Sequence, residues 1–364
     1  MTSRRHFLTG LLASGLIPQA SWADAGNPAY LSAARLPWGV YALVGLDALG
    51  NKLFSIPLPG RGHAAAAHPR QPLAVSFARR PGRFALVVNC AEGKTKARLD
   101  APPGRHFYGH GAFSSDGKTL FTTENDFQNA RGMIGLWDVP NDFARIGSFA
   151  SGGVGPHDLC VMPDGETLVV ANGGVETHPD AGRQKLNLPS MRPTLSYLSL
   201  DGTLLEQQEP PPKWHQNSLR HLAVHDDGLV AIACQWQGDA TASPPLLATH
   251  RRGAPLTFYE TGDDIWRDAK GYLGSVALSG DGREIAVTGP RGSLAIVTDI
   301  QGHLERRLDR PDICGVAPGR CGFVFTTGQG QFLRDADDAG KGALHDLAWD
   351  NHLVPIGKSI QSPC

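Results

Sequence analysis

Short apolar segments separated by tight polar turns recur along most of this chain. Each unit starts with one strand-like segment, passes through a turn that often contains Asp-Gly, and continues into a second run of aliphatic or β-branched residues. The second runs lie at residues 119–123, 167–171, 229–233 and 284–288. This pattern predicts short β-strands, and we find no segment with sustained helical amphipathicity. The sequence therefore indicates an all-β protein.

A histidine stands at the start of four of these units. His63, His110 and His157 are 47 residues apart, and His221 follows after a further 64. A repeat of this length, with a turn between two short strands, is typical of a β-propeller blade. Unit starts at 63, 110, 157, 221, about 275, about 314 and 345 predict a seven-bladed β-propeller.

The two ends of the chain are expected to share one blade. The last unit stops after about two strands, at residues 352–356, and the segments at 38–47 and 52–57 have no inner partner. Pairing of N- and C-terminal strands would close the ring and remove exposed sheet edges. Residues 26–364 are then a single propeller domain.

The 64-residue interval contains a polar insertion at about residues 173–196. Long ordered loops on a rigid scaffold often carry function. We expect either a rim or lid over the channel mouth or a plain solvated insertion.

Residues 1–25 are expected to be a twin-arginine signal peptide. Arg4 and Arg5 precede an apolar run from Phe7 to Ile17, and Ala23-Asp24-Ala25 resembles a cleavage site. The run is shorter than the roughly 20 residues of a permanent span. This predicts a periplasmic protein that is exported in the folded state, with an uncleaved anchor as the alternative.

The composition argues against a nucleic-acid partner. Without the predicted leader the chain has 32 basic and 34 acidic residues, with no large basic cluster. The six cysteines lack the paired spacing of a zinc or haem attachment motif. Cys314 and Cys321 could form a local disulfide, whereas Cys90, Cys160 and Cys234 lie in apolar runs and are expected to be buried.

The recurring histidines are candidates for a metal site, because the first strand of each blade lines the channel of a propeller. Neutral imidazole nitrogens suit iron, copper, zinc and nickel. The predicted metal ligands come from the blade starts, a strand end and the long loop: His110, His157, His221, Glu124 and His178. We expect His63 and His345 to mark the closure of the ring.

A polar rim is also expected around a bound ligand. Its predicted members follow the second strands or lie in the insertion: Asn125, Asn172, Arg183, Lys185 and Arg220. Turn formation is the alternative role for these groups.

Two other roles remain open for the histidines. One is a structural network that links each blade start to its turn, and the other is acid–base catalysis. The chain has no Gly-x-Ser-x-Gly elbow, no phosphate-binding glycine loop and no His-Glu-x-x-His motif. A hydrolase that uses Ser218 or Ser275 stays possible without a specific signal.

A set of motifs across the mature chain resembles a family of twin-arginine-exported bacterial proteins defined by a domain of unknown function. The motifs lie at residues 79–82, 108–111, 123–126, 155–157, 171–174, 177–179, 183–188 and 218–222. Members are commonly encoded beside imelysin-type iron-regulated proteins and dihaem thiol oxidoreductases. The resemblance implies a part in periplasmic iron acquisition or handling and assigns no reaction to any residue.

The first functional hypothesis is a non-enzymatic periplasmic propeller that binds iron, another transition metal or a metal-carrying partner at its channel face. Periplasmic iron-handling proteins are its expected partners. The alternatives are an interaction scaffold without metal, and an enzyme such as a metal-dependent oxidoreductase or a lactonase-like hydrolase.

Overall fold

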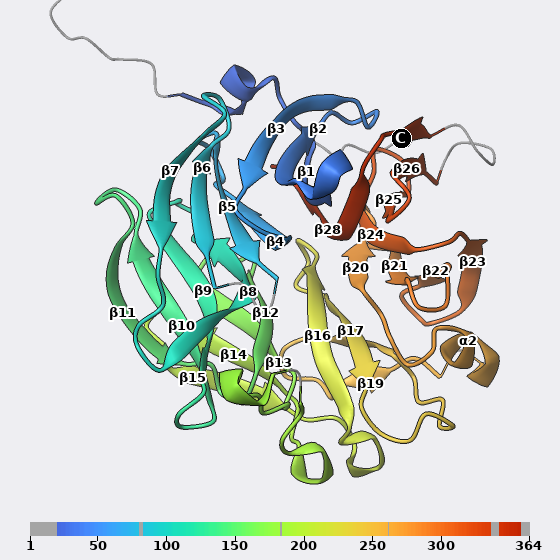
Figure 1. The fold of residues 1–364 in the computed structure, drawn as a ribbon. Helices are drawn as coiled ribbons and strands as arrows, with labels where there is room; N and C mark the ends of the chain where they lie inside the picture. Colours follow the sequence, from blue (N-terminus) through green and yellow to red (C-terminus); the bar gives the residue numbers. More distant parts are fainter. Residues whose placement is uncertain (1–19, 80–82, 183, 261, 336–341, 358–364) are drawn as a thin grey trace, which may run out of the picture.

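Seven four-stranded antiparallel sheets surround a central channel in the computed structural model (Figure 1). The structure describes residues 20–79, 83–182, 184–260, 262–335 and 342–357. The first strands of neighbouring sheets contact one another and form the inner ring. These strands are β4 (Gly62–Ala67), β8 (Arg105–Phe113), β12 (Pro156–Val161), β16 (Asn217–Val224), β20 (Ser275–Leu278), β24 (Ile313–Pro318) and β28 (Ala348–Pro355). The prediction of a seven-bladed β-propeller is confirmed.

Three further strands complete each blade outward from the channel. In the first half of the ring they are β5 (Leu73–Ala78), β6 (Ala85–Asn89), β7 (Lys94–Leu99), β9 (Thr119–Asp126), β10 (Arg131–Asp138), β11 (Ala144–Ala150), β13 (Thr167–Asn172), β14 (Thr194–Ser199) and β15 (Leu204–Gln208). In the second half they are β17 (Val230–Trp236), β18 (Leu247–His250), β19 (Thr257–Phe258), β21 (Glu284–Gly289), β22 (Leu294–Asp299), β23 (Leu304–Asp309), β25 (Phe323–Thr327), β26 (Gln331–Arg334) and β27 (Ala343–Leu344). A short helix, α2 (Asp263–Asp268), lies between β19 and β20.

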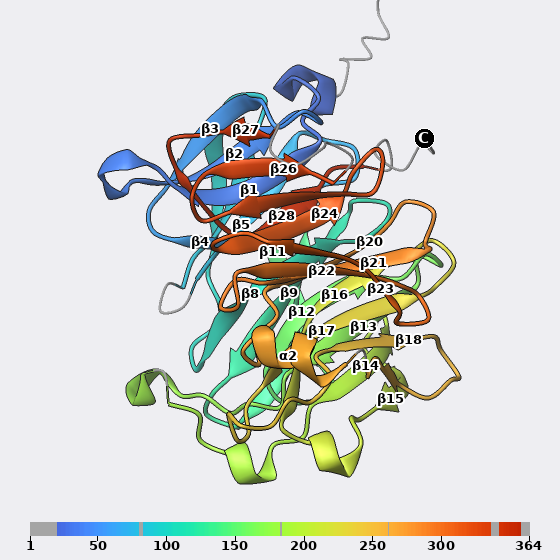
Figure 2. The ribbon, with the colours of Figure 1, turned by 90° about the vertical axis from the view of Figure 1, so that its right-hand side faces the viewer.

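The core consists of apolar layers between adjacent blades. Phe77 of β5 packs in one cluster with Phe107 of β8 and Trp137 of β10, and all three are buried. Burying such a side chain stabilises the fold by about 1.5–3 kcal/mol. The outermost strands are mostly exposed, as in β7 and β23. Figure 2 shows the blades from the side, with the strands of neighbouring sheets stacked across the molecule.

The last blade contains strands from both ends of the chain. β28 pairs antiparallel with β1 (Tyr30–Arg35), which is followed by β2 (Tyr41–Leu46) and β3 (Lys52–Leu58). Figure 1 shows the red β28 beside these blue strands. The sequence pattern predicts two strands from each end of the chain and does not reveal β1. Five of the six β1 residues are buried, so this strand lacks the alternation of apolar and polar residues that would have identified it.

The position expected for the start of the last blade is corrected by the structure. His345 precedes β28, and its Nε2 lies 2.8 Å from the carbonyl oxygen of Gly50. His345 therefore links two neighbouring blades. Its side chain contacts Gly50, between β2 and β3, and its backbone N–H donates to Gly330, between β25 and β26. The histidine of the inner strand is His352.

The polar insertion runs from β13 to β14, the second and third strands of one blade. It contains two short 3₁₀ helices, η3 (Pro179–Ala181) and η4 (Leu188–Ser190). Three further 3₁₀ helices are η1 (Trp22–Ala25), η2 (Pro37–Gly39) and η5 (Pro212–Trp214).

The twin-arginine pattern and its apolar run lie outside the described residues. Part of the predicted leader is nevertheless described: the Trp22 indole donates to the carbonyl oxygen of His68 at 2.9 Å, and Ala25 is buried. Cleavage after Ala25 would remove these contacts. Among the described helices, none has the length and hydropathy needed to cross a membrane.

The possible Cys314–Cys321 disulfide does not form. Cys321 is disulfide-bonded, but Cys314 is a free, buried thiol. Cys90 and Cys234 are buried as expected, and Cys160 is half-buried. Burial raises the pKa of all three thiols, which fits small apolar side chains in the core.

Replacement of Leu353 tests the packing of the closing strand. Leu353→Ala in β28 removes a side chain that is 4% exposed, and we expect the free energy of unfolding to fall by about 2–5 kcal/mol. Leu344→Ala is the matched control, because Leu344 is 75% exposed, and its effect should stay within about 0.5 kcal/mol. Chemical denaturation measures both, and equal effects would contradict a tightly packed β28.

Candidate metal centre

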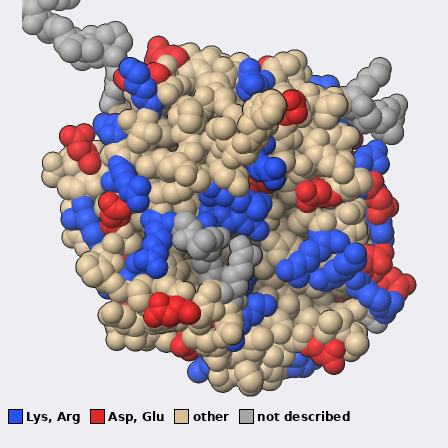
Figure 3. Space-filling model, in the orientation of Figure 1, with Lys and Arg blue, Asp and Glu red and all other residues tan. Residues whose placement is uncertain are grey.

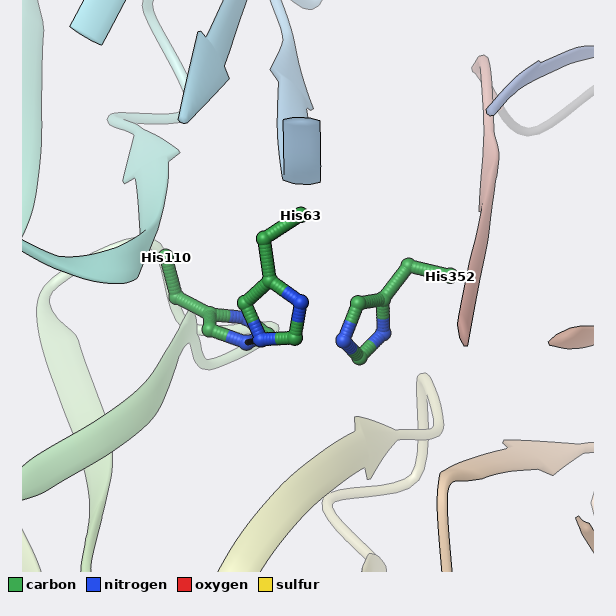
Figure 4. A group of neighbouring side chains, drawn as sticks. All are labelled: His63, His110 and His352. Atoms are coloured by element: carbon green, nitrogen blue, oxygen red, sulfur yellow. Dashed lines mark hydrogen bonds between the residues drawn. The ribbon is translucent and has the colours of Figure 1, made fainter. Parts of the chain in front are cut away.

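Five imidazole rings meet in the channel, one from each of five inner strands. They are His63 of β4, His110 of β8, His157 of β12, His221 of β16 and His352 of β28. The centroids of the contacting rings are 4.6 to 5.8 Å apart. Figure 4 shows His63, His110 and His352 pointing toward one another from three blades.

Irregular strand pairing accompanies these histidines. Four inner strands shift register against the second strand of their blade at or next to the histidine: β4, β8, β12 and β16. β28 shifts against β1 between Trp349 and Leu353, the stretch that contains His352. A bulge turns a side chain away from the regular alternation of a strand. The two inner strands without a histidine differ: β20 pairs with β21 without a shift, whereas β24 shifts against β25 between Ile313 and Gly315.

Two groups of three histidines have one ring nitrogen from each member within 4.8 Å of the others. The first contains His63, His110 and His352, all buried. The second contains His110, His157 and His221, so that His110 belongs to both. The predicted convergence of His110, His157 and His221 is therefore present.

The contacts of His110 and His63 leave a ring nitrogen without a hydrogen-bond partner among the described residues. Nδ1 of His110 lies 3.0 Å from Oδ1 of Asp158, and a neutral His110 that donates its proton there has a lone pair on Nε2. Nε2 of His63 lies only 3.3 Å from that atom. If Nδ1 of His63 carries the proton, two lone pairs face each other. If Nε2 carries it, the Nδ1 lone pair faces Asp350 at 3.8 Å without a hydrogen-bond partner.

Asp350 remains ionised beside this pair although it is buried. Burial raises its pKa, but His63, Arg79 and Arg61 outweigh burial and hold the pKa well below the usual value. Arg61 Nε contacts Oδ2 at 2.6 Å, and an Arg79 nitrogen contacts Oδ1 at 2.8 Å. A carboxylate in this position orients a histidine and increases its basicity toward a metal.

Four of the five imidazoles are held in the neutral form. Burial lowers the pKa of His63 to about 4 and lowers the pKa of His157, His221 and His352 well below the ordinary value. Nearby positive charges, including Arg220 beside His157, lower it further. The neutral ring is the form that binds metals.

His157 is the least suitable ligand of the five. A nitrogen of Arg220 lies 3.3 Å from its Nδ1, and a guanidinium can only donate, so Nδ1 accepts. Neutral His157 then carries its proton on Nε2, which has no partner among the described residues. The group that best fits a metal is therefore His63, His110 and His352.

Two predicted ligands lie elsewhere in the structure. Glu124 of β9 is fully buried, and both of its oxygens pair with Arg145, at 2.7 and 3.0 Å. His178 is partly exposed at the start of η3, where its Nδ1 accepts from the Asp180 backbone at 3.2 Å. Neither residue belongs to a histidine group. Burial of Glu124 within a blade required a countercharge, and Arg145 of β11 supplies it.

The predicted rim separates into structural and pocket residues. Asn172 is buried and bonds to Thr194 and Ser196 of its own blade and to Ser151, which lies between β11 and β12. Asn125 is also buried, and its amide donates to Thr177. Lys185 and Arg220 line the main pocket, whereas Arg183 lies outside the described residues.

Sequence reasoning missed His352, Asp350 and Asp158. Asp158 directly follows His157, and Asp350 precedes His352 by two residues, so each carboxylate lies on the same inner strand as a histidine. These residues could have been found in the sequence by searching the first strand of each blade for a histidine within two residues of an aspartate. It was hidden at 350–352 because the last blade was assigned to begin at His345.

The histidines lie between two cavities. On one side, His63, His157 and His221 border a pocket of about 580 Å³. On the other, His110, His221 and His352 border a channel cavity of about 460 Å³ whose walls include Ala64, Ala66 and Val161. The histidine layer is thus bordered by a polar pocket on one side and by a cavity with apolar walls on the other.

Comparison with protein families identifies residues 56–356 with a family described as "Protein of unknown function (DUF1513)". The chain belongs to this family. A comparison with curated protein sequences finds no match.

Among solved structures, this family member is similar to Kuenenia stuttgartiensis hydrazine synthase, with a TM-score of 0.58 and 14% identity over 82% of this chain and 90% of that one. It is also similar to the β-propeller domain of Cps50 (Swd1) from Myceliophteria thermophila. There the TM-score is 0.58 and the identity 10%, over 85% of this chain and 91% of that one. These similarities show the propeller fold alone.

Acid should destabilise the metal-free protein through the buried imidazoles. The unfolded state binds protons below pH 6.5 while these rings stay neutral, so the free energy of unfolding should fall as the pH drops from 6.5 toward 4. Each ring contributes up to about 1.4 kcal/mol per pH unit. Urea unfolding of resin-treated protein at pH 7, 6 and 5 measures the slope.

His221→Gln should make that slope shallower, because it removes one neutral buried ring. His303→Gln is the control, since this side chain is 78% exposed. An unchanged slope in His221→Gln would contradict the low pKa of His221.

Glu124→Gln should destabilise the protein by about 3 kcal/mol, because it leaves Arg145 without its buried partner. Glu305→Gln changes an exposed residue of β23 and should have an effect within about 0.5 kcal/mol. Denaturant titration compares them, and a neutral effect of Glu124→Gln would show that the ion pair has no structural role.

Proposed function

We propose that this propeller binds a transition-metal ion at His63, His110 and His352 and acts in periplasmic iron acquisition or handling. The observation that carries the proposal is the 3.3 Å separation of the His63 and His110 Nε2 atoms, together with Nδ1 of His63, which is buried without a hydrogen-bond partner among the described residues. Two nitrogens that bind one ion tetrahedrally at about 2.0–2.1 Å are about 3.3–3.4 Å apart.

The surrounding residues also favour a metal. Asp158 orients His110, and Asp350 faces Nδ1 of His63, as carboxylates do beside metal-binding histidines. Nε2 of His352 is buried without a hydrogen-bond partner among the described residues. Such a buried polar atom is costly unless a ligand satisfies it.

Iron is the specific ion we propose, and the support for it is separate from the geometry. Nitrogen donors accept iron, copper, zinc or nickel. The motifs shared with twin-arginine-exported proteins that are encoded beside imelysin-type iron-regulated proteins favour iron. The Arg4-Arg5 pattern supports the periplasm as the place of action.

A metal-dependent enzyme is the second candidate, because the pocket of about 580 Å³ opens onto His63, His157 and His221. A substrate could enter there and approach an ion at the histidine layer. A scaffold without metal is less favoured, since it requires satisfied histidines. Four ring nitrogens, one each on His63, His157, His221 and His352, have no partner among the described residues.

Metal analysis of the protein purified from the periplasm, without a histidine tag or chelator, tests the proposal. We expect one bound ion per chain, with iron as the metal. His63→Ala or His352→Ala should weaken binding by more than roughly 100-fold, because losing even a residue that only orients a ligand costs 10–100-fold. His157→Ala should have a smaller effect.

His345→Ala is the matched control, since His345 binds Gly50 outside the cluster, and it should keep the metal. Absence of metal after supply of ferrous, ferric, cupric and zinc ions would overturn the metal site. Retention of zinc or copper with no uptake of iron would overturn only the assignment to iron and would leave the metal site in place.

A further inference from the structure

Basic side chains surround the pocket above the histidine layer. Arg61, Arg79, Lys185, Arg220 and Arg291 line it, and Asp312 is the one carboxylate among its described lining residues. Figure 3 shows Lys and Arg gathered around the hollow near the centre of one face. These residues come from widely separated parts of the ring, so the positive charge encircles the pocket.

Among the described residues that line the pocket, carboxylates are fewer than cations. Arg61 and Arg79 share a single buried partner, Asp350. Arg220 contacts the neutral ring of His157, and the guanidinium of Arg291 lies 4.3 Å from the centre of the Tyr272 ring. The described residues that line this concave site thus include five basic side chains and one carboxylate, Asp312, and a lining of this kind attracts anions.

Donors that suit an oxyanion lie inside the pocket. Arginine guanidinium groups bind carboxylates and phosphates through paired hydrogen bonds. A volume of about 580 Å³ accommodates a small organic molecule and is large for a lone inorganic ion.

We propose that this pocket binds a small polycarboxylate whose separated carboxylates reach arginines from different blades. The inference rests on the proposed function in one respect, because it places the anion directly over an ion held by the histidines. A polycarboxylate has the additional oxygen donors that such an ion accepts. One compact tetrahedral anion would reach fewer of the cations.

Calorimetry with citrate tests the inference on protein depleted of metal by a resin, so that no soluble chelator competes for the pocket. We expect saturable binding that weakens as salt rises. Arg291→Ala should weaken it roughly 10- to 100-fold, as expected for the loss of a charged hydrogen bond. Arg283→Ala removes the same charge from a side chain that is 84% exposed, and it should bind citrate like the parent.

Inorganic phosphate and sulfate are run in parallel. Lack of saturable citrate binding, phosphate or sulfate binding as tight as citrate, or equal losses in Arg291→Ala and Arg283→Ala would each overturn the inference. Metal uptake by the same proteins is measured separately. If the protein binds metal but not citrate, only the polycarboxylate proposal is rejected. If it binds citrate but not metal, only the proposed function is rejected.

Discussion

The antiparallel pairing of β28 with β1 joins the ring and also completes the histidine layer. A blade buries its apolar faces only against its neighbours, so the ring needs every blade, including the one assembled from both chain ends. The same strand carries Asp350 and His352 into the channel. The positions of these two side chains therefore depend on the backbone pairing that closes the fold.

Charge is arranged in layers along the channel axis. A basic mouth lies on one side, neutral imidazoles lie in the middle, and small apolar side chains line the other side. Asp350 connects the first two layers, since it binds Arg61 and Arg79 and faces His63. An ionised carboxylate is tolerated in this buried position because two guanidinium groups compensate it.

The repeat spacing was sufficient to predict the propeller, because each unit of strand, turn and strand forms one blade and equivalent starts must lie on one ring. It also predicted that His110, His157 and His221 would converge. It could not rank the histidines, since their protonation depends on contacts such as Arg220 with His157 and Asp158 with His110. It also held no information about Arg145, 21 residues from Glu124, which pairs with that carboxylate inside the blade.

His352 illustrates a different limit. The segment before it contains a histidine at 345 and resembles a blade start, whereas the inner strand begins only at residue 348. Register within one short strand decides which side chain enters the channel, and bulges shift that register locally. Neither effect is visible in spacing alone.

The order of strands along the chain also limits when the site can exist. β28 follows every other strand of the ring in sequence, yet it supplies His352 to the group that contains His63 and His110. Synthesis proceeds from the N-terminus. A nascent chain that has produced six complete blades still lacks one corner of the histidine triangle. A ligand that needs all three imidazoles could therefore bind only after β28 has paired with β1, and its binding would stabilise the closed ring.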